Sequence, residues 1–125
     1  MDKFVYKKIG EYTDLPSTIS QIFNLEIDEV ILALEKRKAL GSVKIAIDIE
    51  LPHVELTNID IQGLIWVRSK DLNFLVMVID DQHPSRSVID VLHKLLSKEG
   101  LDILRSVHSQ IELNKVIRGA LKYGG

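Results

Sequence analysis

The sequence predicts an α+β fold with an N-terminal three-helix unit, antiparallel β-strands and two C-terminal helices. Three patterns predict it. Apolar residues recur every three or four positions between 16 and 40, alternate with polar residues between 43 and 51, and return to helical spacing after residue 84. A chain of 125 residues is long enough to form one domain with its own core.

The first predicted helix covers residues 2–12. Val5, Ile9 and Tyr12 stand at positions i, i+4 and i+7, which is helical spacing, and Asp2 can cap the first turn. The same residues also alternate between two faces, so a β-strand is the alternative. A helix is preferred because it completes a three-helix unit with the two helices that follow.

Two further helices are predicted within residues 16–41. Pro16 and Ser17 indicate a helix start, and Asn24 suits the turn after it because Asn tolerates the left-handed conformation. Gly41 then ends the second helix. The apolar residues of these two helices are Ile19, Ile22, Phe23, Ile27, Val30, Ile31 and Leu34.

The middle of the chain predicts strands of two kinds. Residues 43–51 and 54–63 alternate apolar with polar side chains and are separated by Pro52, which interrupts a strand. Residues 64–67 and 74–79 are almost continuously apolar. We therefore expect these last two to form a hairpin that is covered on both faces.

The C-terminal part predicts two helices. Pro84 opens the first, Gly100 interrupts the pattern, and the second runs over residues 101–122. A helix of this length at the end of a small domain commonly packs against its symmetry mate. We therefore expect a homodimer that forms through the C-terminal helices.

The N-terminal pattern resembles the winged helix-turn-helix family over residues 2–68. The resemblance depends on Ile19, Ile22, Leu25, Val30, Leu34, Gly41 and Val43, while Arg37 departs from it, because the family has an apolar residue there. It implies a winged unit over residues 1–63, with the wing tip near 51–54 or near 57–58. Residues 64–125 would then be a β-hairpin with C-terminal helices, a dimerisation extension of the same domain.

The resemblance implies a transcriptional regulator that binds double-stranded DNA. The polar residues of the first motif helix and its turn would contact DNA, together with the basic end of the second motif helix. These residues are Ser17, Thr18, Ser20, Gln21, Asn24, Lys36, Arg37 and Lys38.

The charge distribution favours a second hypothesis. The net charge is −2, and residues 42–63, which include the expected wing, carry Lys44 against four acidic side chains, although phosphate contacts require basic ones. The alternative is a winged-helix protein-interaction module, or a subunit of a larger assembly, that does not bind DNA. Ile31 and Leu32 would then face a protein partner.

The sequence offers little for catalysis. It has no Cys, no Gly-x-Ser-x-Gly turn and no phosphate-binding glycine loop, so we expect no enzyme and no cofactor. The best metal-binding cluster is Asp80, Asp81 and His83, for which a polar loop that caps the next helix is the preferred interpretation. We therefore expect no metal.

The sequence also predicts a cytoplasmic protein. No apolar run reaches the length of a membrane span, and no signal-peptide pattern opens the chain.

Overall fold

The computed structural model describes residues 2–122, in which a mixed six-stranded sheet forms the central layer. The strand order is β1-β5-β6-β3-β2, and β4 also pairs with β6. The strands are β1 (Asp2–Lys8), β2 (Lys44–Ala46), β3 (Ile49–Glu50), β4 (His53–Leu56), β5 (Gln62–Arg68) and β6 (Asn73–Asp80).

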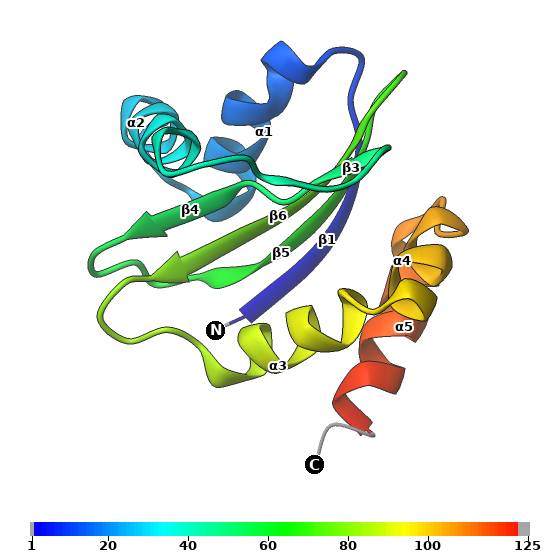
Figure 1. Ribbon diagram of the computed structural model, residues 1–125. Coiled ribbons are helices and arrows are strands. Elements are labelled where there is room, and N and C mark those ends of the chain that lie inside the picture. The colour runs from blue at the N-terminus through cyan, green and yellow to red at the C-terminus, as the bar shows by residue number, and fades with distance from the viewer. Residues whose placement is uncertain (1, 123–125) are drawn as a thin grey trace.

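Helices cover both faces of the sheet (Figure 1). A short 3₁₀ helix, η1 (Tyr12–Asp14), leads into α1 (Leu15–Phe23) and α2 (Ile27–Ala39), which pack on one face. On the other face lie α3 (Arg86–Leu95), α4 (Lys98–Arg105) and α5 (Gln110–Lys122). The result is a three-layer sandwich.

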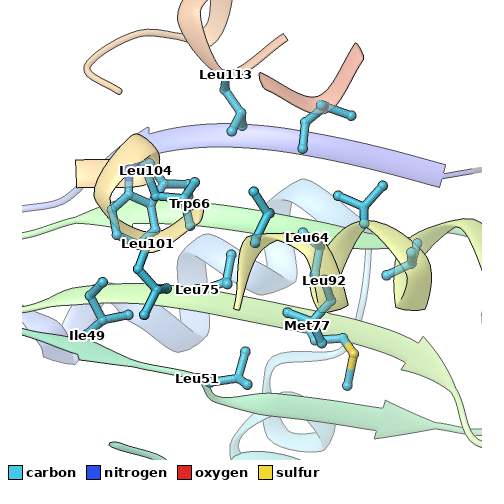
Figure 2. Packing of buried hydrophobic residues seen from close by; sticks show 14 of the residues in the cluster. Ile49, Leu51, Leu64, Trp66, Leu75, Met77, Leu92, Leu101, Leu104 and Leu113 are labelled. Atoms are coloured by element: carbon cyan, nitrogen blue, oxygen red, sulfur yellow. The ribbon is translucent and has the colours of Figure 1, made fainter. Parts of the chain in front are cut away.

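The β5–β6 hairpin forms the centre of the core. Leu64 and Trp66 of β5 face α3–α5, whereas Ile65 and Val67 face α1 and α2. Figure 2 shows the apolar cluster between the sheet and α3–α5, in which Leu75 and Met77 of β6 lie beside the side chains of β5. The predicted hairpin is confirmed, and its two apolar faces are both covered by helices.

The helix predicted over residues 2–12 is wrong, because residues 2–8 form strand β1, which runs parallel to β5. The two-residue alternation of a strand, and not the helical spacing, describes these residues. Phe4 and Tyr6 pack toward one cluster and Val5 toward the other, so both faces of the strand are used. Pairing with an apolar neighbouring strand outweighs the local helical spacing.

The predicted N-terminal winged unit is absent from the described residues. Residues 43–51 form not one strand but the β2–β3 hairpin, which turns at Ile47 and Asp48, and β3 then pairs with the distant β6. Of the three expected helices only α1 and α2 exist, although Asn24 does end α1 in the left-handed conformation. The fold class expected from the sequence is therefore wrong in its arrangement.

The C-terminal part contains three helices where two were expected. The predicted helix over 101–122 is broken at residues 106–109, and Gly100 lies within the first turn of α4. The side chain of Ser97 accepts a hydrogen bond from the Gly100 N–H and so begins α4 there. No helix within residues 2–122 is long and apolar enough to cross a membrane.

Replacing Gly63 tests the close approach of β1 to β5. A Cβ at Gly63 would lie 1.8 Å from the Lys3 carbonyl oxygen, so Gly63→Ala must push the two backbones apart. We expect it to lower the free energy of unfolding by about 3 kcal/mol. Urea denaturation followed by circular dichroism measures this change.

Gly119→Ala provides the matched control, because a Cβ there meets no atom within 4 Å and the residue lies in α5. We expect this variant to be as stable as the parent or up to about 1 kcal/mol more stable. Equal stability of the two variants would contradict the register of β1 on β5.

Candidate functional site

The candidate site begins where the sheet is interrupted beside β6. Pro52 separates β3 from β4, and its carbonyl accepts a hydrogen bond from the Met77 N–H at 3.0 Å. Val54 packs among the side chains under α1 and α2, so strand alternation turns His53 and Glu55 toward the opposite face. Among the described strands β4 pairs only with β6, which leaves its outer edge open.

His53 lies half-buried at this open edge. Its Nε2 is enclosed and has no hydrogen-bond partner within residues 2–122, whereas Nδ1 is not enclosed in this way. Burial lowers the pKa of His53 below its ordinary value of 6.5, and the positive charge of Arg37 lowers it further, against the opposing effect of Glu55. The imidazole is therefore neutral at pH 7.

Arg37 reaches this corner from the last turn of α2, which packs against β4. Its Nη1 donates a hydrogen bond to the Gly41 carbonyl at 3.3 Å. Two residues later the Val43 carbonyl accepts from the Leu51 N–H at 2.8 Å. The α2–β2 connection therefore runs beside the residues that precede β4, and from there the guanidinium charge lowers the pKa of His53.

The pair combines a nucleophile with a fixed cation. A neutral imidazole has a free lone pair, and an adjacent guanidinium binds the oxygens of a phosphoryl group or a carboxylate. Glu55 adds one carboxylate on the same face of the strand. This arrangement suits transfer of an anionic group to the imidazole.

The comparison with solved structures gives an informative similarity. No protein-family model matches the chain, and neither does any curated protein. Among solved structures, the chain is similar to the nitrogen regulatory protein IIA-Ntr from Neisseria meningitidis. The TM-score is 0.65 at 17% identity, with 91% of this chain and 92% of that chain covered. The chain has the fold of IIA-Ntr.

This similarity and the sheet overturn the winged helix-turn-helix resemblance. The similarity to IIA-Ntr covers 91% of the chain. Strand β1, which the winged-helix interpretation made a helix of the N-terminal unit, instead lies beside β5 and β6 in one sheet. The predicted DNA-binding transcriptional regulator is therefore wrong. The alternative, a winged-helix interaction module, lacks its fold as well.

The residues predicted to contact DNA serve several local roles. Ser17 and Thr18 donate to the Asp14 carbonyl at 3.0 and 2.8 Å, and Ser20 donates to the Leu25 carbonyl. These hydroxyl groups therefore stabilise the two ends of α1. Gln21 is exposed, and Asn24 ends the helix.

The basic residues at the end of α2 differ in their surroundings from the polar residues of α1 that were also predicted to contact DNA. Lys36 and Lys38 are exposed, and Arg37 is half-buried and lies near His53. Lys38 lines a groove of about 920 Å³ between the two N-terminal helices and the loop after β5. Asn24 lines a different cavity, of about 500 Å³.

The candidate metal-binding residues at the end of β6 accept hydrogen bonds from other parts of the protein. Asp80 Oδ1 accepts from the N–H groups of Gln82 and His83 at 2.9 and 3.0 Å, and these bonds lower the pKa of Asp80. Asp81 accepts from the Thr57 hydroxyl at 3.0 Å. No group of three or more potential ligands is placed to hold a metal within the described part of the chain.

Two partner predictions remain predictions. The C-terminal helices turn their apolar residues toward the sheet, while Ile103, Ile111 and Leu121 stay exposed, so homodimerisation through them is still an expectation. Leu32 is exposed and Ile31 lines the larger groove, which keeps both as an expected protein contact.

Sequence reasoning missed His53. The useful signal was that His53 follows Pro52 directly and precedes the apolar Val54. A strand that restarts there places the imidazole opposite a buried position. The contribution of Arg37 could not be inferred, because it depends on where α2 ends relative to the sheet edge.

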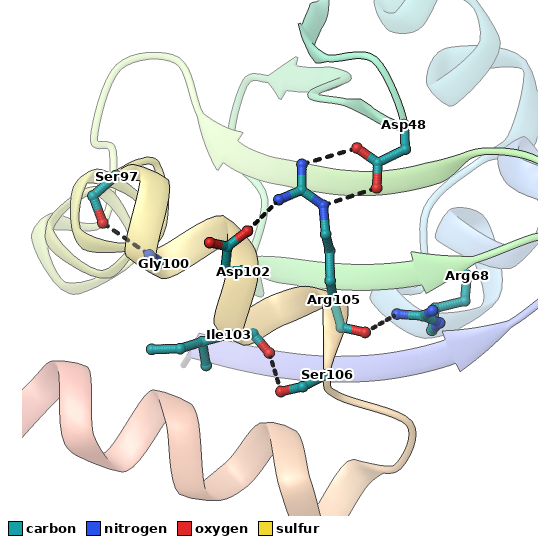
Figure 3. A network of polar contacts seen from close by, with 8 residues as sticks. All are labelled: Asp48, Arg68, Ser97, Gly100, Asp102, Ile103, Arg105 and Ser106. Atoms are coloured by element: carbon teal, nitrogen blue, oxygen red, sulfur yellow. Dashed lines mark hydrogen bonds and ion pairs between the residues drawn. The ribbon is translucent and has the colours of Figure 1, made fainter.

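A polar network fixes the hairpin that precedes this site (Figure 3). Arg105 in α4 donates two hydrogen bonds to Asp48 at the β2–β3 turn, both at 2.9 Å, and a third to Asp102 at 2.6 Å. Its backbone carbonyl accepts from Arg68. The hydrogen bonds from Arg105 hold the pKa of Asp48 below its ordinary 3.8.

Asp48→Asn tests this network. Because the folded-state pKa of Asp48 is depressed, its charge stabilises the fold above pH 3.8, and that contribution is lost as the pH falls through the folded-state value. We expect the variant to have a lower melting temperature at pH 7, with the difference shrinking toward pH 3. Thermal unfolding across this pH range is the measurement.

Asp102→Asn is the control, since it removes the contact within α4 but keeps the link from Arg105 to the hairpin. It should lower the melting temperature less than Asp48→Asn. An Asp48→Asn difference that stays constant down to pH 3 would mean that the ion pair does not stabilise the fold.

Proposed function

We propose that the chain is a regulatory protein that accepts a phosphoryl group on His53. The observation that supports this most directly is a half-buried imidazole with an enclosed, unpartnered Nε2, placed near the guanidinium of Arg37 at an open sheet edge. The similarity to a nitrogen regulatory protein favours a signalling role over a metabolic one.

The transfer would proceed as a displacement at phosphorus. In the tautomer that carries its proton on Nε2, the lone pair of Nδ1 forms the N–P bond while the bond from phosphorus to the donor's leaving group breaks, and the leaving group departs with that electron pair. The imidazole proton on Nε2 is released to solvent.

Arg37 would stabilise the phosphorylated state. Charge on the phosphoryl oxygens develops next to a fixed guanidinium, which costs no reorganisation when the group arrives. An ordinary histidine is already mostly neutral at pH 7. The depressed pKa of His53 extends the pH range in which the ring is neutral and nucleophilic to more acidic solution. Burial and the cation therefore serve the same step.

The first test is labelling with phosphoramidate, a small donor that transfers its phosphoryl group to imidazole with loss of ammonia. We expect one phosphate per chain, located on His53 by mass spectrometry, and none on His53→Gln. His83→Gln is the matched control, because His83 is exposed in the loop after β6. Equal labelling of His83, His93 and His108 would contradict a dedicated site.

The second test concerns Arg37. Arg37→Met should slow phosphorylation of His53 by about tenfold, which corresponds to the loss of one charge-assisted hydrogen bond. It should also raise the pKa of His53 toward its ordinary value, because one of the two effects that lower it disappears. The rate is followed by ³¹P NMR and the titration by ¹H–¹⁵N NMR.

Lys36→Met controls for net charge, since Lys36 is the exposed neighbour of Arg37 on the same helix. It should leave both the rate and the pKa unchanged. The same slowing in both variants would show that Arg37 acts only through overall charge and would refute its role at the phosphoryl group.

A further inference from the structure

A carboxylate occupies the same strand face as the proposed phosphoryl acceptor. His53 and Glu55 are alternate residues of β4, so their side chains point to the same side of the sheet, about 7 Å apart along the strand. Their register partners on β6, Met77 and Ile79, both belong to the cluster under α3–α5, which confirms the shared face. Glu55 is exposed, whereas His53 is half-buried.

The two charged groups that act on His53 have opposite consequences. Arg37, from the end of α2, lowers the pKa of His53 and would favour a negative phosphoryl group there, whereas Glu55 raises that pKa and would disfavour one. The outer edge of β4 is unpaired among the described strands, and Glu55 is exposed there. A carboxylate can deprotonate an attacking water either directly or through one bridging water.

We infer that Glu55 is a general base that hydrolyses the phosphorylated His53 and so limits the lifetime of the signal. In this step the carboxylate takes a proton from water as the water oxygen bonds to phosphorus. The N–P bond breaks, its electron pair returns to the imidazole nitrogen, and the nitrogen recovers a proton. The products are inorganic phosphate and unmodified His53. The inference rests on the proposed function, because it requires a phosphoryl group on His53.

The alternative for Glu55 is a solvated residue on an edge strand, where charges prevent association of sheets. That role requires a charge but neither a base nor a position beside His53. The two roles therefore differ in what they predict for the stability of a phosphohistidine, while both leave folding unaffected. Because Glu55 is exposed, its substitution should not unfold the protein.

The experiment measures the decay of the phosphorylated protein. The full chain is labelled with phosphoramidate, the reagent is removed by desalting, and loss of phosphate from His53 is followed at pH 7.5 by intact mass spectrometry and ³¹P NMR. We expect Glu55→Gln to lengthen the half-life at least tenfold, in the range of general base catalysis. Glu55→Asp, which keeps the carboxylate, should recover part of the hydrolysis rate.

Glu50→Gln is the matched control, because Glu50 precedes the proline and lines the groove on the α1–α2 side of the sheet. It removes the same charge and should leave the half-life unchanged. The parent should also decay more slowly in D₂O than in H₂O, and this difference should diminish in Glu55→Gln.

The possible failures are distinguishable. A parent protein that takes up no phosphate on His53 would overturn both the proposed function and this inference. A parent that is labelled on His53 but decays at the same rate as Glu55→Gln would overturn the role of Glu55 alone. Equal lengthening in Glu50→Gln and Glu55→Gln would also overturn it, since charge and not position would then set the rate.

Discussion

The β5–β6 hairpin has to be buried on both faces, and the rest of the structure follows from that constraint. Its strands expose almost no polar side chains, and leaving either face in water would cost about 1.5–3 kcal/mol for each large apolar residue. A single helical layer cannot meet this requirement. The chain therefore places α1 and α2 on one side and α3–α5 on the other, and adds strands at both edges.

The two outer edges of the sheet are treated differently. At the β1 edge the side chain of Gln110 supplies two hydrogen bonds, because its Oε1 accepts from the Tyr6 N–H at 2.8 Å and its Nε2 donates to the Phe4 carbonyl at 2.9 Å. This amide blocks the edge against further pairing. On the other side of β6, β4 pairs with no further strand among the described residues, and it carries His53. The β1 edge is thus occupied by a side-chain amide, whereas the outer edge of β4 stays unpaired among the described strands.

The sequence predicted those parts of the fold that local patterns decide. The continuous apolar runs of β5 and β6 indicated a doubly covered hairpin, and helical spacing located α1, α2 and α3. It failed for β1, because Val5 and Ile9 satisfy two periodicities and only the distant β5 selects one of them. It failed again for the β2–β3 hairpin, since nothing local reveals that Ile49 pairs with Asn73. The winged-helix interpretation arose from these two errors together.

The candidate site was harder to predict than the fold because it departs from the rule that buried polar atoms have hydrogen-bond partners. Two enclosed side-chain nitrogens lack partners within residues 2–122, His53 Nε2 and Trp66 Nε1, and each such group costs about 1–3 kcal/mol. Trp66 is 1% exposed in the closed core, where its ring gains more from burial than its N–H loses. His53 has no such compensation, because it is half-buried at an open edge near a cation that disfavours its protonation. A cost without a structural return is expected where a residue is kept for its chemistry. This contrast is what singles out His53 from the other buried polar atoms.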